Sequence, residues 1–333
     1  MNTPGSPPLI EITVDDLRRL IIRCLRRLGL TEDESAIVCR VLLYAELRGK
    51  SQGILKILEK TVLPASDRTP LEIVALSDAM HRLEGNGNPG MVVMTAAADV
   101  TRSAALKSGL ALTVTRGTSS STGSIGFYAS RIAEAGLIAM VLAGSPKVMA
   151  VNGAVEPSLG TNPIALAVPT SHGPVLLDMA TSMTTWFALI DNARTGAPLP
   201  TGVAIDRFGT VTTDAHEAMQ GALLPFAGAK GSGLAFMFEL LTGPLAGAGI
   251  VGDQGDNRGN CLLAINPTVL APDFVPRCDE LLKRIRQQKR VDESQPIRLP
   301  GDASSSRVAQ AEKRGTVRIR KDWHGELLNL ASS

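Results

Sequence analysis

Hydrophobic positions in the first part of the chain recur at helical spacing. Thr13, followed closely by two aspartates, is a favourable N-cap for a helix over residues 14–28. The segment Thr31–Glu34 has the pattern of a capping box, and apolar residues follow it at helical spacing as far as Gly49. A third helix is expected over residues 52–63. The chain therefore opens with a helical unit.

The pattern changes after Pro70, where short apolar runs begin to alternate with helical segments. Such alternation predicts an α/β sheet covered by helices. The expected strands are 71–77, 81–83, 110–115, 137–143, 164–168, 174–179 and 261–265. The expected helices are 91–108, 126–135, 183–193, an apolar and buried helix over 231–245, and a surface helix over 272–290. Residues 291–315 are polar and are predicted to be irregular and to wrap back over the body.

Composition narrows the class of protein. A chain of 333 residues can bury a sizeable core, and its low aromatic content of 3% means that aliphatic side chains must build that core. The net charge of +2 comes from acids and bases mixed along the chain, and the basic run at 283–290 lacks the interleaved aromatics of a nucleic-acid site. No apolar run approaches the ~20 residues that span a bilayer, so neither nucleic acid nor membrane is an expected partner.

The cysteines and the N-terminus indicate a cytoplasmic protein. The four cysteines lie far apart in apolar contexts, without a zinc-type spacing, and are expected to be reduced thiols, with no metal site. Residues 1–16 lack the basic and apolar regions of a secretory signal peptide. We therefore expect a cytoplasmic location.

Residues Gly85–Gly90 match the G-x-G-x-x-G pattern of dinucleotide-binding folds letter for letter. A short strand precedes them, Pro89 replaces a backbone N–H that should face the pyrophosphate, and no acid follows at the required distance. We interpret the segment as a glycine turn in which Pro89 stands near the first position of the next helix.

The stretch Gly160–Pro200, together with Lys230–Leu234, carries the strongest signal. It resembles the malate/L-lactate dehydrogenase family of the second type, whose members are NAD(P)-dependent reductases of 2-oxo and 2-imino acids. The resemblance covers nearly the whole chain. It implies a non-Rossmann NAD(P)-binding α/β body over residues 73–295 and a discontinuous helical domain formed by 9–72 with 296–333. It also implies a homodimer with the active site near the subunit interface.

The cofactor site implied by the resemblance has three parts and an adjoining loop. The parts are the segment Asp178–Thr184, the pair Lys230–Gly231, and the turn Pro300–Asp302 after Arg298. Helix starts with free N–H groups and hydroxyls can bind phosphate, and a lysine adds charge there. The hydroxyl-rich loop over residues 118–124 could bind phosphate or ribose, or it could equally be a flexible lid. The matched positions for NADPH or NADH are Ser121, Thr122, Gly123, Asp178, Met179, Ala180, Thr181, Ser182, Lys230, Gly231, Arg298, Pro300, Gly301 and Asp302.

The proton relay is where this chain departs from the family. Where the family carries a catalytic histidine in a Ser-His-Gly motif, this chain has Ser51-Gln52-Gly53, and a second family histidine falls at Ser121. The implied relay is Ser51, Gln52 and Asp206. An amide such as Gln52 can donate a hydrogen bond but cannot transfer a proton near neutral pH.

Two further positions correspond to the family's substrate contacts. Lys56 stands where the family carries the arginine that holds the substrate carboxylate, so the charge is kept and the bidentate fork is lost. Without the resemblance, Lys56 could equally lie on a solvated helix face. Thr161 matches a second substrate contact.

The missing histidine favours imine chemistry. A cyclic imine can enter already protonated, so hydride transfer neutralises it and needs a nearby anion, for which Asp206 is the candidate. We therefore predict an NAD(P)H-dependent reductase of small cyclic 2-imino carboxylates. The alternatives are a reductase of 2-oxo acids of the malate, lactate or ureidoglycolate type, with a tyrosine such as Tyr128 as acid, and a cofactor-binding homologue without catalysis.

Overall fold

The computed structural model describes residues 8–250, 253 and 258–332. Its N-terminal part is helical, with α1 at Val14–Arg27 and α2 at Glu32–Leu47. The Thr13 hydroxyl accepts the Asp16 N–H at 3.0 Å, and the capping box at Thr31 is formed, as predicted. The third helix is shorter than predicted: α3 is a single turn at Leu55–Leu58.

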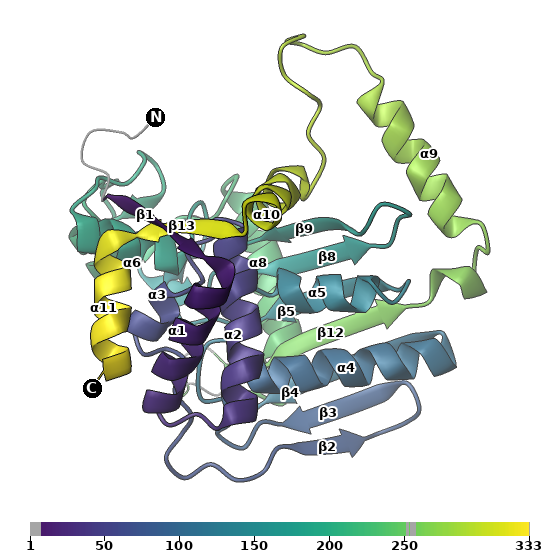
Figure 1. Ribbon diagram of the computed structural model, residues 1–333, viewed down its shortest axis with the longest axis horizontal. Helices are drawn as coiled ribbons and strands as arrows, with labels where there is room; N and C mark the ends of the chain where they lie inside the picture. Colours follow the sequence, from purple (N-terminus) through teal and green to yellow (C-terminus); the bar gives the residue numbers. More distant parts are fainter. Residues whose placement is uncertain (1–7, 251–252, 254–257, 333) are drawn as a thin grey trace.

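The N-terminal and C-terminal segments of the described chain lie side by side (Figure 1). Strand β1 (Leu9–Thr13) pairs antiparallel with β13 (Thr316–Arg320), and α11 (Lys321–Ser332) packs against α1. Neither strand was predicted, because each is a single short segment whose only partner lies at the other end of the described chain. The division of the chain into the two domains given above stays a prediction.

A seven-stranded sheet forms the centre of the molecule, in the order β2-β3-β4-β12-β5-β8-β9. Only β3 and β4 are parallel neighbours; the other pairs are antiparallel. The strands are β2 (Glu72–Ala75), β3 (Met80–Glu84), β4 (Leu110–Arg116), β5 (Ile138–Ala143), β8 (Ile164–Val168), β9 (Val175–Met179) and β12 (Asn260–Ile265). These are the strands that the apolar runs predict, and the α/β fold class is confirmed.

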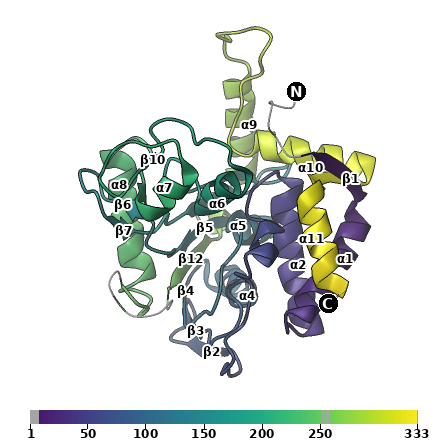
Figure 2. The same cartoon turned by 90° about the vertical axis from the view of Figure 1, so that its left-hand side faces the viewer.

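Helices cover both faces of this sheet (Figure 2). The helices α4 (Gly90–Ser108) and α5 (Gly126–Ala133) join the main core on one face. On the other face, α8 (Ala229–Thr242) places Phe238 against Val114 and Leu142. The predicted burial of this helix is wrong for one side, because Leu234, Phe236, Met237 and Leu240 are exposed. An apolar sequence on all sides does not reveal which side faces the core.

A smaller, four-stranded sheet has the order β10-β11-β6-β7, and its strand β7 contacts α8. Its strands have only two or three residues each, too few for a periodic signal: β6 (Met149–Ala150), β7 (Pro157–Leu159), β10 (Ala204–Ile205) and β11 (Ala222–Leu223). Two helices pack against it, α6 (Trp186–Thr195) and α7 (Ala215–Gln220).

An extended arm leaves the sheet after β12 (Figure 1). It contains the short helix η1 (Pro267–Val269) and α9 (Phe274–Arg286), and it returns to the body at α10 (Asp302–Arg314). The prediction that residues 291–315 are irregular is therefore wrong for α10. Its low apolar content hides it from periodicity, since only Ala311 along it is buried.

The Gly85–Gly90 segment is a turn that supports the next loop. The Gly85 N–H donates to the Arg116 carbonyl at 2.7 Å, and the Gly87 N–H donates to the Gly117 carbonyl at 2.8 Å. Pro89 is the N-cap residue of α4. Since these N–H groups are bonded within the protein, the turn does not present them to a phosphate.

The four cysteines are free thiols, three of them buried. In the described ranges, no group of three metal-ligating side chains comes together. Nor does any helix there combine the length and apolar character needed to cross a membrane.

Candidate active site

A cavity of about 380 Å³ lies where α3, the loop after β4 and the start of α6 meet. It brings together the predicted residues Gln52, Lys56, Thr161 and Ser121–Gly123. The other lining residues that the structure describes are Lys60, Thr61, Leu63, Thr118, Ser119, Ser120, Ala143, Gly144, Ser145, Pro146, Val148, Pro163, Thr185, Trp186, Phe187, Arg258 and Asn260. Among all the described lining residues, Lys56, Lys60 and Arg258 are cationic and none is a carboxylate.

Lys56 is buried, with 2% of its surface exposed, and does not lie on a solvated helix face. Its ammonium donates to the Ser121 hydroxyl at 2.7 Å and stands 3.5 Å from the centre of the Phe187 ring. Among the described residues no carboxylate pairs with it. Burial lowers the pKa of Lys56 to about 7, because the charged form loses its hydration.

The Ser51–Gly53 turn is fixed from behind by Glu46 of α2. The Glu46 carboxylate accepts the Ile54 N–H at 2.6 Å, and a Cβ at Gly53 would collide with this same carboxylate. Any side chain at position 53 would therefore displace the Glu46 carboxylate and its hydrogen bond to Ile54. Burial raises the pKa of Glu46 to about 7. Ser51 does not line the cavity, but its hydroxyl lies 3.3 Å from the hydroxyl of Thr185, which does.

The segment after β9 connects the cavity to the start of α8. Thr181 and Ser182 are buried, and Ser182 forms a bridge with Pro225. The Phe226 N–H donates to the Thr181 carbonyl at 3.0 Å, and the Gly231 N–H donates to the Phe226 carbonyl at 3.0 Å. Two of the three predicted cofactor parts, the segment with Thr181 and the pair at Lys230, are thus adjacent.

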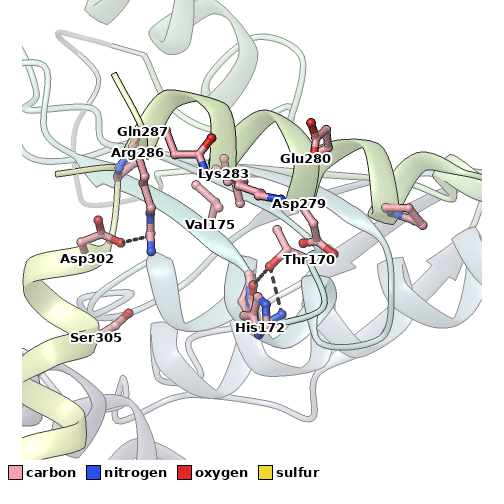
Figure 3. A pocket seen from close by; sticks show the side chains of 16 residues that line it. Thr170, His172, Val175, Asp279, Glu280, Lys283, Arg286, Gln287, Asp302 and Ser305 are labelled. Atoms are coloured by element: carbon pink, nitrogen blue, oxygen red, sulfur yellow. Dashed lines mark hydrogen bonds and ion pairs between the residues drawn. The ribbon is translucent and has the colours of Figure 1, made fainter. Parts of the chain in front are cut away.

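The third predicted cofactor part, Pro300–Asp302, lies against β9 itself. A Cβ at Gly301 would lie 3.1 Å from the Leu176 carbonyl oxygen, so the glycine allows α10 to begin against β9. Pro300–Asp302 line a groove of about 830 Å³ between α9, α10 and the turn after β8. Figure 3 shows Arg286 of α9 reaching Asp302, which it contacts at 2.9 Å. Arg298 lies in an adjoining hollow together with Asp302.

These parts fit a dinucleotide. The helices α8 and α10 both begin without a side-chain cap. The N–H groups of Lys230, Gly231 and Asp302 are bonded to backbone carbonyls of the preceding turns. The N–H groups left for phosphate oxygens are those of Ala229 in α8 and of Ala303 and Ser304 in α10. Lys230 is exposed in the first turn of α8 and would add a positive charge. The hydroxyls of Ser121 and Thr122 line the cavity at the other end.

Asp178 has a role within the protein. Its carboxylate pairs with Lys50 and accepts the Ser124 hydroxyl at 3.1 Å and the Gly126 N–H at 3.2 Å. It therefore caps the start of α5, where a negative charge is favourable. The neighbours Met179 and Ala180 are half-buried on the same segment.

Asp206 does not line the cavity. Its carboxylate accepts the N–H groups of Phe208 and Thr210, at 2.8 and 2.9 Å, and so closes the turn after β10. This is the geometry of an Asx turn. A catalytic role for Asp206 stays a prediction, and its placement here gives that role no support.

Sequence reasoning missed several residues of the cavity. Arg258 and Asn260 come to it from the start of β12, and Trp186 and Phe187 come from α6. Only the tertiary fold brings these segments to α3. The tyrosine considered as a substitute acid is committed elsewhere, since the Tyr128 hydroxyl donates to the Thr122 carbonyl at 2.7 Å. None of the four histidines lines the cavity.

Comparison with known proteins decides the family. The model of the family described as malate/L-lactate dehydrogenase matches residues 12–328. The chain belongs to this family. A Δ1-pyrroline-2-carboxylate/Δ1-piperideine-2-carboxylate reductase from Pseudomonas aeruginosa is 31% identical, over 97% of this chain and 99% of that protein. A (2R)-3-sulfolactate dehydrogenase (NADP(+)) from Chromohalobacter salexigens is 29% identical, over 87% and 89%.

A solved structure shows the same fold. The dehydrogenase from Sinorhizobium meliloti matches with a TM-score of 0.90 and 31% identity, covering 98% of this chain and 99% of that one. The predicted family is confirmed, and so is the prediction of an oxidoreductase that uses NADH or NADPH. The relatives act on small carboxylates by their names, and they do not agree on which one.

Proposed function

We propose that this protein reduces small cyclic 2-imino carboxylates with NADH or NADPH. The observation that carries this proposal is the composition of the cavity. Cationic groups suit a substrate carboxylate, and none of the described lining residues is an acid that would repel it. The apolar wall of Leu63, Val148, Trp186 and Phe187 suits the methylene groups of a ring.

When bound, the nicotinamide supplies a hydride with its two electrons. The residues of this chain hold and orient the two reactants. Lys230, with the uncapped starts of α8 and α10, is proposed to bind the phosphates, and Thr161 and Gln52 to orient the substrate. The hydrogen bonds between Thr161 and Thr181 fix the cavity wall relative to the cofactor segment.

The proposal is tested by a turnover panel. Cyclic imino acids with five- and six-membered rings and the 2-oxo acids pyruvate, oxaloacetate and 3-sulfopyruvate are each offered with NADH and NADPH. The imino acids are expected to give a kcat/KM at least tenfold above the 2-oxo acids. Saturable cofactor binding without turnover of any substrate would instead support a homologue that has lost catalysis.

A second candidate is favoured by the additional cations. Lys60 and Arg258 line the same cavity as Lys56, and a substrate with two negative groups would use more than one of them. This would fit a 2-oxo acid with a second carboxylate or a sulfonate. In the panel, the dianionic oxaloacetate and 3-sulfopyruvate would then exceed both pyruvate and the imines.

We also propose that the protein is a homodimer. The exposed apolar residues Leu234, Phe236, Met237 and Leu240 lie on successive turns of α8, and such a cluster is unusual on a monomer surface. A second copy would cover them. Sedimentation of the wild type should give a dimer, and Phe236→Glu should shift it towards the monomer.

A further inference from the structure

The Lys56–Ser121 contact joins two side chains on one wall of the cavity. The Lys56 ammonium uses one of its three protons to reach the Ser121 hydroxyl at 2.7 Å, and its remaining protons have no carboxylate partner among the described residues. Ser121 also accepts the Gly123 N–H at 3.2 Å, which fixes its position. Because Lys56 and Ser121 both line the cavity, this ammonium is a candidate proton donor to a substrate bound there.

We propose that Lys56 is the catalytic residue that gives the proton to the substrate when hydride arrives. This inference rests on the proposed function and names the acid that Gln52 cannot be. It has the imine enter as the neutral base and not as the protonated iminium first expected, because the described lining of the cavity holds cations and no carboxylate. As the hydride bonds to the imine carbon, the electron pair of the C=N π bond moves to nitrogen. The nitrogen takes a proton from Lys56 Nζ, the lysine becomes neutral, and a proton from solvent restores it. A 2-oxo acid would follow the same course with oxygen in place of nitrogen.

The surroundings of Lys56 suit an acid that works near neutral pH. Burial lowers its pKa to about 7, and general acids act best when their pKa lies near the working pH. The centre of the Phe187 ring lies 3.5 Å from the Lys56 ammonium and stabilises its protonated form until the proton is transferred. Ser121 acts as a positioning residue that aims the ammonium.

A role as general acid excludes Lys56 as the group that binds the substrate carboxylate. An ammonium paired with a substrate carboxylate would be a weaker acid, because the anion stabilises the charged form. We therefore assign the carboxylate to Arg258 and Thr161, which line the same cavity. An arginine also offers the bidentate geometry that a carboxylate prefers.

Two variants separate the two roles. Lys56→Arg keeps the charge but cannot release its proton, since the guanidinium stays protonated. It should lower kcat by about 10²–10⁴-fold, the usual range for loss of a general acid, with KM within about threefold of wild type. The wild-type rate should fall above pH 7, and this decline should be absent from the residual rate of the variant. Lys107→Arg, at the far end of α4, is the matched control.

Binding is measured without turnover in Lys56→Met. Pyrrole-2-carboxylate, a planar ring carboxylate that cannot accept hydride, is the probe, and Trp186 in the cavity wall reports its binding. The variant should bind the probe within about threefold of wild type, whereas Arg258→Gln should weaken binding by about tenfold or more. Loss of binding in Lys56→Met with retention in Arg258→Gln would overturn the assignment, as would a wild-type kcat in Lys56→Arg.

A chemical readout judges Lys56 independently of any substrate. Cyanate carbamylates neutral amines, so the pH dependence of labelling, followed by mass spectrometry, reports when Lys56 loses its proton. Labelling of Lys56 should rise around pH 7, well below the pH at which the exposed Lys107 reacts. A rise for Lys56 only above pH 9 would overturn the inference. Inactivity of the wild type across the panel would count against the proposed function and leave this measurement to decide the acid.

Discussion

The Thr181 N–H and the Thr181 hydroxyl both donate to the Thr161 carbonyl oxygen, each at 2.9 Å. This pair of hydrogen bonds ties the segment after β9 to the wall of the cavity. Since Thr161 lines the cavity and Thr181 stands beside the start of α8, the contact sets the distance between the substrate region and the proposed cofactor region.

Thr181→Val tests this connection. The substitution keeps the shape and removes the hydroxyl donor, while the N–H still satisfies the Thr161 carbonyl. We expect the free energy of unfolding to fall by about 1 kcal/mol, as for one neutral hydrogen bond. We also expect kcat/KM to fall while the fold is kept. Urea unfolding and steady-state kinetics measure the two effects. Thr268→Val, on the exposed η1, is the control. It removes a solvent-exposed hydrogen bond from the Thr268 hydroxyl to the Asn266 side chain, so stability should change by less than in Thr181→Val and kcat/KM should not change.

Lys230→Ala tests the phosphate site. Removing an exposed lysine from the uncapped start of α8 should raise the Kd of the preferred nicotinamide cofactor by about fivefold to tenfold, the effect of one charge-assisted hydrogen bond that is partly screened by solvent. The KM of the substrate should stay near its wild-type value. Cofactor fluorescence titration gives the Kd, with Lys107→Ala as the control. An unchanged Kd would move the phosphates away from α8.

Asp206→Asn separates a turn residue from a catalytic one. An asparagine oxygen can still accept the Phe208 and Thr210 N–H groups, so the turn should survive. Because Asp206 lies outside the cavity lining, we expect kcat/KM to change less than about twofold. Asp206→Ala should instead lower stability. A severe loss of activity in Asp206→Asn alone would restore the sequence-based prediction that its charge supports an iminium.

Glu46 predicts a pH dependence of stability. Its folded-state pKa is raised to about 7 from an ordinary value near 4.5, so between these pH values the folded protein binds more protons than the unfolded chain. Stability contributed by the neutral carboxyl is therefore present at low pH and is lost as the pH rises towards 7. Urea unfolding of the wild type and of Glu46→Gln should show a difference that grows in favour of the variant, by about 1–3 kcal/mol, between pH 5 and pH 8.

The elements of the fold with a strong local signal follow from the sequence. The caps at Thr13 and Thr31 are local, because a side chain bonds the backbone three residues on. The strands of the central sheet are also predicted locally, because each one is a short run of apolar residues. By contrast, the two-residue strands β6, β10 and β11 have no period to detect, and β1 and β13 pair across most of the chain.

The residues of the candidate site also fall into two groups, those that a sequence motif identifies and those that only the tertiary structure brings to the cavity. The motif at Asp178–Thr184, the pair Lys230–Gly231 and the glutamine at position 52 were identified from the sequence, because motif matching needs only the order of residues. Arg258 and Phe187 were not, since no local pattern places them at a cavity that α3 helps to form.

The sequence alone determined the family and the α/β class, and it predicted that Gln52 stands where the family carries a histidine. The tertiary structure decided which charged side chains are buried. It placed Asp206 in a turn at the surface and Lys56 inside the cavity, against Ser121 and Phe187. The physical reason is that burial depends on contacts between distant segments, and burial is what changes a lysine from a solvated cation into an acid that can act near neutral pH.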